Sequence, residues 1–197
     1  SGTTNNLRAV AYDGNSTLVA VGFSGTILTS SDGTTWTSRT SGTSSDINNV
    51  TYADAFVAVG DNGTLLVSTD GISWTDQTSS CGMTENQWDV ASNGTVGVSI
   101  GDNGSIYTST DDGVNCTKRT SGTTVEFNEL IYGNSTFVAA GDNGTIITSS
   151  DGIQNWTSRT SGTTNALYGG VYTASNVSGN SEFVLVGSSG KLLTSSD

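Results

Sequence analysis

The sequence predicts an all-β fold, a five-bladed β-propeller, from three observations. A phrase of about 40 residues recurs along the chain, each of the first four copies contains four short strand-like segments, and no segment has the periodicity of a helix. Pro is absent, so no linker is apparent. We expect residues 1–197 to form one domain of five repeats, which span residues 1–40, 41–80, 81–120, 121–160 and 161–197.

Each repeat opens on the same tripeptide and continues through four segments in a fixed order. Ser-Gly-Thr begins at Ser1, Ser41, Ser121 and Ser161, and Cys81 occupies the equivalent place in the third repeat. In the first repeat the segments are an alternating stretch, an apolar run, a Gly-Thr-Ile-Leu-Thr-Ser-Ser-Asp phrase and a Trp-Thr-Ser-Arg-Thr phrase, at residues 7–12, 18–22, 25–32 and 36–40. Val, Ile, Thr and aromatic residues bounded by Gly, Asn, Asp or Ser are typical of β-strands.

Asn-Gly pairs join the second segment to the third in three repeats, at Asn62-Gly63, Asn103-Gly104 and Asn143-Gly144. Asn-Gly favours a type I′ hairpin because that turn needs positive φ at both central residues. Each repeat is therefore expected to form a four-stranded antiparallel sheet. Such a sheet cannot bury both faces alone, so radial packing about an axis is favoured. A linear β-solenoid is the competing arrangement, but its repeats are usually shorter and carry no hairpins.

The composition argues against several kinds of function. Eighteen acidic and six basic residues give a net charge of -12, which would repel a nucleic-acid backbone. The chain has no His, the commonest general base and metal ligand. No apolar run approaches the roughly 20 residues of a membrane span. We therefore expect no nucleic-acid partner, no membrane span and no cofactor.

The third and fourth segments together share the motif Ser-x-Asp-Gly-x-x-Trp-Thr, at residues 30–37 and 68–75 and, with one inserted residue, at 149–157. This motif resembles the Asp-box, or BNR, repeat of sialidase-like propellers. The longer phrase Phe-Val-Ala-Val-Gly-x-x-Gly-Thr-(Ile/Leu)-Leu is similar to that of photosystem II assembly-factor-like propellers and of bacterial surface propellers. The resemblance covers the whole chain and implies the architecture. It implies no single function, because Asp boxes occur in hydrolases, receptors and scaffolds.

Sialidases of the resembled family bind a substrate carboxylate with three arginines and use a Tyr–Glu pair as nucleophile. The arginines of this chain are Arg8, Arg39, Arg119 and Arg159. The last three occupy one repeated place on the predicted outer strand, so we expect them at the rim and not at a shared axial pocket. Sialidase activity is therefore not expected.

A glycosidase of another kind would need two carboxylates about 5–10 Å apart. Eight of the acids recur at equivalent turn positions of the repeats. The other ten are Asp13, Asp46, Asp54, Asp76, Glu85, Asp89, Asp112, Glu126, Glu129 and Glu182. No two of them form a pair that stands out, and solvated loop charge is the favoured interpretation. The Asp-Asn-Gly turns offer too few oxygens to hold calcium. We expect no catalytic and no metal-binding residue.

Ten Asn-x-Ser/Thr sequons are candidates for N-glycosylation, conditional on a eukaryotic secretory origin. They lie at Asn15, Asn49, Asn62, Asn93, Asn103, Asn115, Asn134, Asn143, Asn155 and Asn176. Three of them are copies of the Asn-Gly hairpin, so the number of sequons exceeds the number expected by chance by less than the raw count suggests. All are expected on turns or outer strands.

The two cysteines, Cys81 and Cys116, both fall in the third repeat, where they replace a Ser and a Trp of the pattern. Paired loss of two repeat residues favours a disulfide in an oxidising compartment. A strict meander argues against it, because it would place the two residues at opposite faces, beyond the roughly 7 Å that a disulfide allows between Cα atoms.

The fifth repeat ends before its fourth segment, so its last strand is expected to present an open edge at Leu192, Leu193, Thr194 and Ser195. One explanation is truncation or disorder of the missing strand. The other is that a second copy, or a repeat of the parent chain, fills the edge by strand addition and links subunits into a fibre or array.

These features predict a non-enzymatic, structural or adhesive propeller, extracellular or at the cell surface, N-glycosylated and self-assembling through the edge of the fifth repeat. The alternative is a lectin-like propeller with one carbohydrate site per repeat. Its candidate residues are the repeated Tyr12, Tyr52, Tyr132 and Tyr172, although packing is the favoured role for these rings. A glycoside hydrolase-like enzyme is the third possibility.

Overall fold

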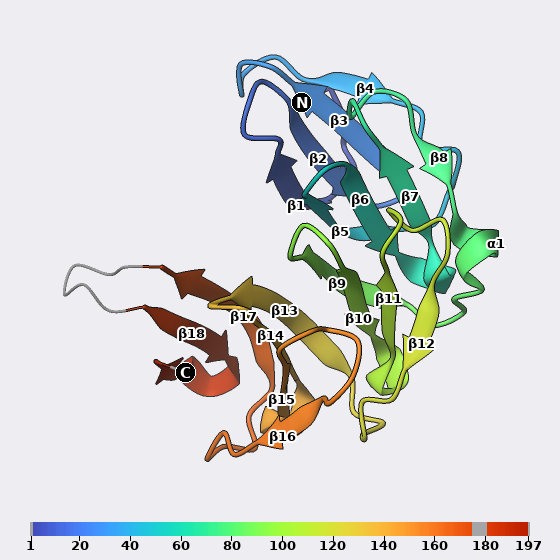
Figure 1. The fold of residues 1–197 in the computed structure, drawn as a ribbon. Helices are drawn as coiled ribbons and strands as arrows, with labels where there is room; N and C mark the ends of the chain where they lie inside the picture. The colour runs from blue at the N-terminus through green and yellow to red at the C-terminus, as the bar shows by residue number, and fades with distance from the viewer. Residues whose placement is uncertain (1, 175–180, 197) are drawn as a thin grey trace.

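The computed structural model describes residues 2–174 and 181–196, which form five antiparallel sheets, one for each predicted repeat (Figure 1). We call these sheets blades 1 to 5. Blade 1 comprises β1 (Leu7–Tyr12), β2 (Leu18–Gly22), β3 (Thr26–Ser30) and β4 (Thr37–Arg39). Blade 2 comprises β5 (Ile47–Tyr52), β6 (Phe56–Gly60), β7 (Leu65–Ser68) and β8 (Thr75–Asp76).

Blade 3 comprises β9 (Gln87–Ser92), β10 (Gly97–Gly101), β11 (Ile106–Ser109) and β12 (Thr117–Arg119). Blade 4 comprises β13 (Phe127–Gly133), β14 (Thr136–Gly141), β15 (Ile146–Ser149) and β16 (Thr157–Arg159). Blade 5 has three strands within the described residues, β17 (Leu167–Thr173), β18 (Glu182–Gly187) and β19 (Lys191–Ser195). Within every blade the strands pair in chain order, which is the predicted meander.

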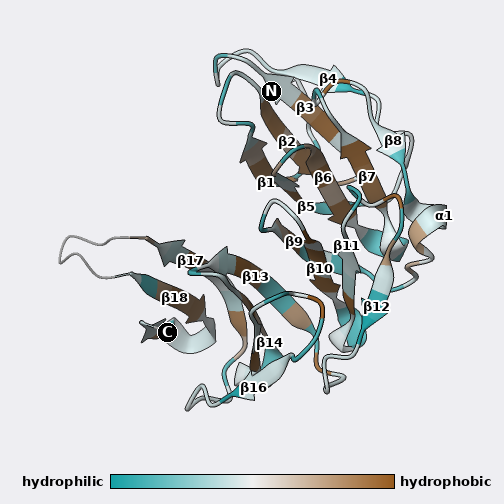
Figure 2. Cartoon of the chain, in the orientation of Figure 1, coloured by the Kyte–Doolittle hydropathy of each residue, from teal (hydrophilic) through white to brown (hydrophobic). Residues whose placement is uncertain are grey.

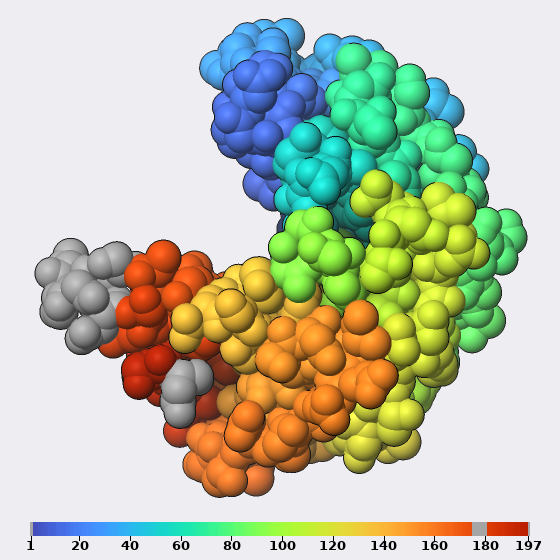
Figure 3. Space-filling view, viewed as in Figure 1, coloured from blue at the N-terminus to red at the C-terminus, as the bar shows by residue number. Residues whose placement is uncertain are grey.

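The blades are arranged around a common axis, with the first strand of each blade innermost. β1 packs beside β5, β5 beside β9, β9 beside β13, and β13 beside β17. The five blades form an arc, and Figure 3 shows an open gap between blade 1 and blade 5. Radial packing is therefore as predicted, but the five blades do not close into a ring.

The hairpins between the second and third strands have the predicted turn. In blade 2, Asn62 and Gly63 both have positive φ, 57° and 69°, and the Thr64 amide donates to the Asp61 carbonyl at 3.1 Å. The corresponding three-residue turns of blades 2 to 5 are η1 (Asp61–Gly63), η2 (Asp102–Gly104), η3 (Asp142–Gly144) and η4 (Ser188–Gly190). The Gly that ends the preceding strand is also required, because a Cβ on Gly60 would lie 2.1 Å from the Asp46 carbonyl oxygen.

The core lies between neighbouring blades. The second strands of blades 1 to 4 are almost fully buried, and apolar residues concentrate on the inner three strands while loops and outer strands are polar (Figure 2). Phe56 packs on Val19, Val21 and Ile27 of blade 1, and Phe137 packs on Val98 of blade 3 in the same way. The aromatic ring of one blade thus fills the space against the blade before it.

The loop before each outer strand is organised by an aspartate. Asp32 Oδ1 accepts the amides of Thr34 and Thr35 at 2.8 and 2.7 Å, and Asp70 and Asp151 bind two amides each in the same way. These amide donors hold the pKa of Asp32 well below its usual range. Trp36 Nε1 donates to the Gly33 carbonyl at 3.2 Å, which closes the loop over the ring.

One helix departs from the expectation of an all-strand chain. A single turn, α1 (Thr78–Cys81), follows β8 and ends at Gly82 in the left-handed conformation. It has no periodic apolar face, so the sequence gives no signal for it. None of the helices in the described residues is long and apolar enough to cross a membrane.

Candidate functional site

Three residues spaced 40 apart, Asn49, Asp89 and Glu129, occupy the same place on the innermost strands of blades 2, 3 and 4. Asp89 is 5% exposed. Its Oδ1 accepts Asn49 Nδ2 at 2.6 Å and the Val90 amide at 2.7 Å, and its Oδ2 accepts the Leu130 amide at 2.6 Å. The carboxylate therefore joins three blades at the axis.

Glu129 lies close enough to Asp89 for their charges to interact. Burial raises the pKa of Asp89 to about 7, against the effect of its amide donors. Burial and the charge of Asp89 raise the pKa of Glu129 to about 8. The pair consequently retains a proton near neutral pH, and Glu129 is the more easily protonated of the two.

The interpretation of these two acids as solvated loop charge is wrong. Both lie on inner strands that pack on their neighbours, and their 40-residue spacing was the signal that placed them in register. Both oxygens of Asp89 are occupied by donors and its side chain is buried, so its geometry suits a structural tie better than attack on a substrate.

The position one residue before Asn49, Asp89 and Glu129 also repeats in every blade, and its side chains line one end of the axis. Arg8, Asn48, Trp88, Asn128 and Tyr168 supply one side chain per blade to an open depression there. The Arg8 guanidinium lies 4.5 Å from the ring centre of Phe23 and 5.5 Å from that of Trp88. These contacts hold the cation over two aromatic faces.

The remaining arginines lie where the repeat pattern predicts. Arg39, Arg119 and Arg159 end the outer strands β4, β12 and β16. Each Nε donates at 2.8 Å to a Thr hydroxyl of the neighbouring strand. They are spread along the outer strands of three blades and form no common cluster.

Cys81 and Cys116 form a disulfide with Cα atoms 4.7 Å apart. The geometric argument against this pairing is wrong because the chain does not continue as a strand after β8. Instead, α1 turns back and carries Cys81 to the start of β12.

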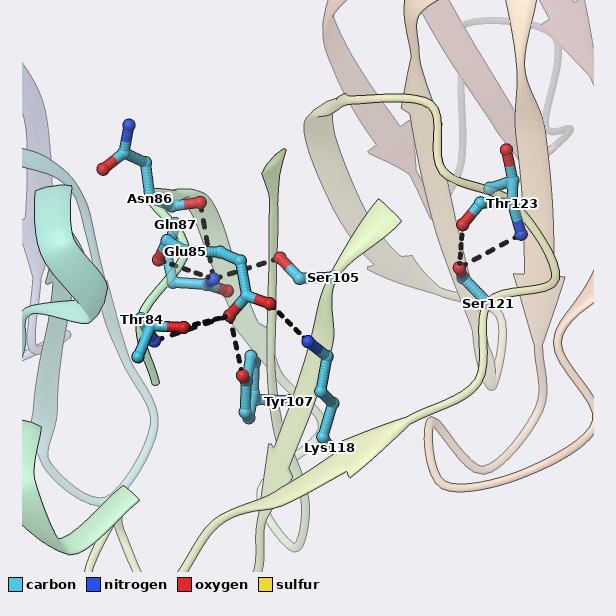
Figure 4. A network of polar contacts seen from close by, with 9 residues as sticks. All are labelled: Thr84, Glu85, Asn86, Gln87, Ser105, Tyr107, Lys118, Ser121 and Thr123. Carbon is cyan, nitrogen blue, oxygen red and sulfur yellow. Dashed lines mark hydrogen bonds and ion pairs between the residues drawn. The ribbon is translucent and has the colours of Figure 1, made fainter. Parts of the chain in front are cut away.

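Figure 4 shows a polar network around Glu85. Glu85 accepts the Tyr107 hydroxyl at 2.8 Å and forms an ion pair with Lys118. The bond from Lys118 is the main cause that lowers the pKa of Glu85 to about 2. Together these contacts fix the Tyr107 ring between blades 2 and 3.

The sequons differ in their suitability for a glycan. Those exposed on turns and loops are Asn15, Asn62, Asn103, Asn115, Asn134, Asn143 and Asn155. Asn93 is half-buried and caps its own turn by accepting the amides of Thr95 and Val96. The expected location is wrong for Asn49, which lies on the inner strand β5 with its amide nitrogen bonded to Asp89. Asn176 lies outside the described residues.

The repeated tyrosines pack against phenylalanines across their own hairpins. The ring centres of Tyr52 and Phe56 are 4.7 Å apart, and those of Tyr132 and Phe137 are 4.6 Å apart. Tyr172 makes the same contact with Phe183 at 4.8 Å. This geometry favours packing over carbohydrate binding for these three. Among the described residues, no group of three or more Cys, Asp or Glu side chains is placed to hold a metal ion.

The two faces at the ends of the arc are apolar and uncovered. Val10 of blade 1 is 61% exposed, whereas its equivalents Val50, Val90 and Leu130 are buried against the preceding blade. Val186 of blade 5 is 45% exposed, whereas the equivalent residues of blades 1 to 4, which pack on the following blade, are fully buried: Val21, Val59, Ile100 and Ala140. Val171 and Leu192 extend the exposed face of blade 5, and Leu7 and Tyr12 extend that of blade 1.

No protein-family model and no curated protein sequence matches this chain. Solved structures match over nearly its whole length. YCF48 bound to D1 peptide has a TM-score of 0.77 at 20% identity, over 98% of this chain and 66% of that one. YCF48 from Cyanidioschyzon merolae has a TM-score of 0.72 at 18% identity, over 99% and 68%.

Two further solved structures are similar to the chain. The GH74 enzyme of Niastella koreensis has a TM-score of 0.68 at 18% identity, over 100% of this chain and 31% of that one. Saccharomyces cerevisiae Sqt1 has a TM-score of 0.70 at 14% identity, over 98% and 60%. The chain thus spans about two thirds of the length of the YCF48 structures. At these identities the matches establish the fold, and the chain is a β-propeller repeat protein.

Proposed function

We propose that the chain is a non-enzymatic structural module that assembles head to tail with copies of itself, through the apolar faces of blades 1 and 5. The exposure of Val10 and Val186 carries the proposal, because both positions are buried in the three interfaces that join blades 1 to 4. In the three interfaces between blades 1 and 4 the residue equivalent to Val10 packs on the residue equivalent to Val186 of the blade before, and in the fourth interface the position of Val10 is taken by Gly170. Blade 1 of a second copy therefore has the side chains that fit blade 5 of the first.

This contact joins unlike faces, so it continues from copy to copy unless the arc closes. The net charge of -12 opposes association, and added salt screens that repulsion. The outer edge of β19 at Leu192, Leu193 and Thr194 is a second element of this surface for strand addition. The bonds made by Asp32, Asp70 and Asp151 support the resemblance to Asp-box repeats, and exposed sequons support a glycosylated, extracellular module.

Sedimentation velocity over a hundredfold range of concentration tests the proposal. The wild-type chain is expected to form larger species as concentration and salt increase. Val10→Lys and Val186→Lys are each expected to be monomeric, because a charged ammonium cannot be buried unpaired in the contact. Val114→Lys alters an exposed valine on a loop of blade 3 and is expected to assemble as the wild type does.

A mixture of the two monomeric variants distinguishes head-to-tail assembly from other modes. Val10→Lys keeps an intact blade 5, and Val186→Lys keeps an intact blade 1, so an equimolar mixture should give a dimer that grows no further. A wild-type chain that stays monomeric throughout would contradict the proposal. So would assembly that persists unchanged in both single variants.

A further inference from the structure

Blade 3 lacks the aromatic residues that the other blades place at one point of the fold. In blades 2, 4 and 5 a Tyr of the first strand pairs across the hairpin with a Phe of the second. In blade 3 the same register pairs Ser92 with Gly97. The Trp that precedes the outer strand in blades 1, 2 and 4 is also replaced there, by Cys116.

A cavity of about 280 Å³ lies where these rings are missing, between blades 2 and 3. Its apolar wall on blade 2 includes Val57, Val59 and Leu65. The equivalent residues of blade 4, Val138, Ala140 and Ile146, pack on Phe183 of the next blade. The wall of blade 2 therefore has the shape that receives an aromatic ring, but it faces Gly97.

The opposite side of the cavity is formed by blade 3 and is held in place. Val90, Met83 and Tyr107 are buried there, and Tyr107 is fixed by its bond to Glu85. Cys116 contributes the disulfide to the same wall. The cavity is thus bounded by ordered side chains and not by a loop alone.

From this geometry we propose that the blade 2–blade 3 cavity binds a small aromatic molecule, which replaces the rings absent from blade 3. An aliphatic cavity of about 150 Å³ is enough to bind benzene. Asp54 and Asp112, both exposed, and the hydroxyls of Ser92 and Thr108 line the remainder. These acceptors favour a neutral or cationic ring with an N–H or O–H donor, of the size of phenol or indole, and disfavour an aromatic carboxylate.

Titration calorimetry with indole tests the site, and benzoate serves as the charge control. Indole is expected to bind with a dissociation constant of about 10 µM to 1 mM, and benzoate at least about tenfold more weakly because of the acidic mouth. Amide shifts in the NMR spectrum should concentrate on Val57, Val90 and Thr108. Shifts confined to the open depression at Arg8 and Trp88 would overturn the assignment.

Gly97→Phe restores the ring of the repeat. The φ of Gly97 is not positive, and a Cβ added there meets nothing closer than the Ser109 carbonyl oxygen at 3.9 Å, so the side chain can enter the cavity. This variant is expected to weaken indole binding at least about 100-fold while raising the melting temperature. Leu18→Phe makes the same kind of change at the equivalent position of blade 1 and should leave binding unchanged.

Ser92→Tyr provides a second test if Gly97→Phe does not fold, because it fills the cavity from the partner strand. Wild-type binding of indole by either filled variant would overturn the proposal, as would the absence of binding to the wild-type chain. The cavity is separate from the exposed faces of blades 1 and 5. A negative result for indole binding would therefore leave the proposed self-assembly through Val10 and Val186 unaffected.

Discussion

Glu129→Gln is expected to make the chain more stable at alkaline pH and to reduce the dependence of its stability on pH. The pKa of Glu129 is raised from 4.5 to about 8 by burial and by the charge of Asp89. The folded chain therefore binds a proton that the unfolded chain releases. This contribution to stability is fully present below about pH 4.5 and is lost as the pH rises through about 8.

Urea unfolding at several pH values measures the effect. Ionisation of Glu129 should lower the free energy of unfolding of the wild type by on the order of 2–4 kcal/mol as the pH rises from about 4.5 to about 8. Gln keeps an oxygen that can accept the Gly170 amide, as Glu129 does, but it does not titrate. A residual slope from Asp89 should remain, because burial raises that pKa to about 7 against the effect of its amide donors.

Glu182→Gln on β18 is the matched control and should retain the wild-type slope. Asp89→Asn is less suitable as a test, because its amide nitrogen would face the donors that now bind both carboxylate oxygens. A wild-type chain whose stability rises steadily from pH 5 to pH 8 would contradict the assignment of a shared, retained proton to this pair.

The repeat made most of the fold predictable. Strand order, the turns at Asn62, Asn103 and Asn143, and the outer-strand position of Arg39 all follow from local pattern, because hairpin pairing needs only contacts between neighbouring segments. The gap in the arc was not predictable from pattern. It depends on the angle between blades, which is the summed result of side-chain packing at every interface.

The candidate sites were harder to predict because they depend on which blade a side chain faces. Asp89 and Glu129 look like scattered acids until the repeat alignment places them beside Asn49. The same alignment places Ser92 and Gly97 where other blades have rings, but only the register and the cavity show that nothing replaces those rings. α1 carries no signal in the sequence, so the proximity of Cys81 to Cys116 could not be derived.

Loss of the Cys81–Cys116 disulfide is expected to destabilise the chain by about 3–4 kcal/mol, because the bond constrains a 35-residue separation in the unfolded state. The paired Cys81→Ser/Cys116→Ser variant should melt roughly 10 °C lower. The wild type with reductant should behave similarly, whereas the double variant should not respond to reductant. Equal melting temperatures for oxidised and reduced wild type would contradict a stabilising bond.

A Trp at position 116 tests why the disulfide lies in this blade. In blade 2, Trp74 packs on Phe56 with ring centres 6.4 Å apart, but blade 3 offers Gly97 in place of that Phe. Cys81→Ser/Cys116→Trp should therefore recover little stability alone and more when Gly97→Phe is added. The two changes should be coupled, because each ring supplies the surface that the other buries. Additive effects would mean that the disulfide and the cavity arose from unrelated features of blade 3.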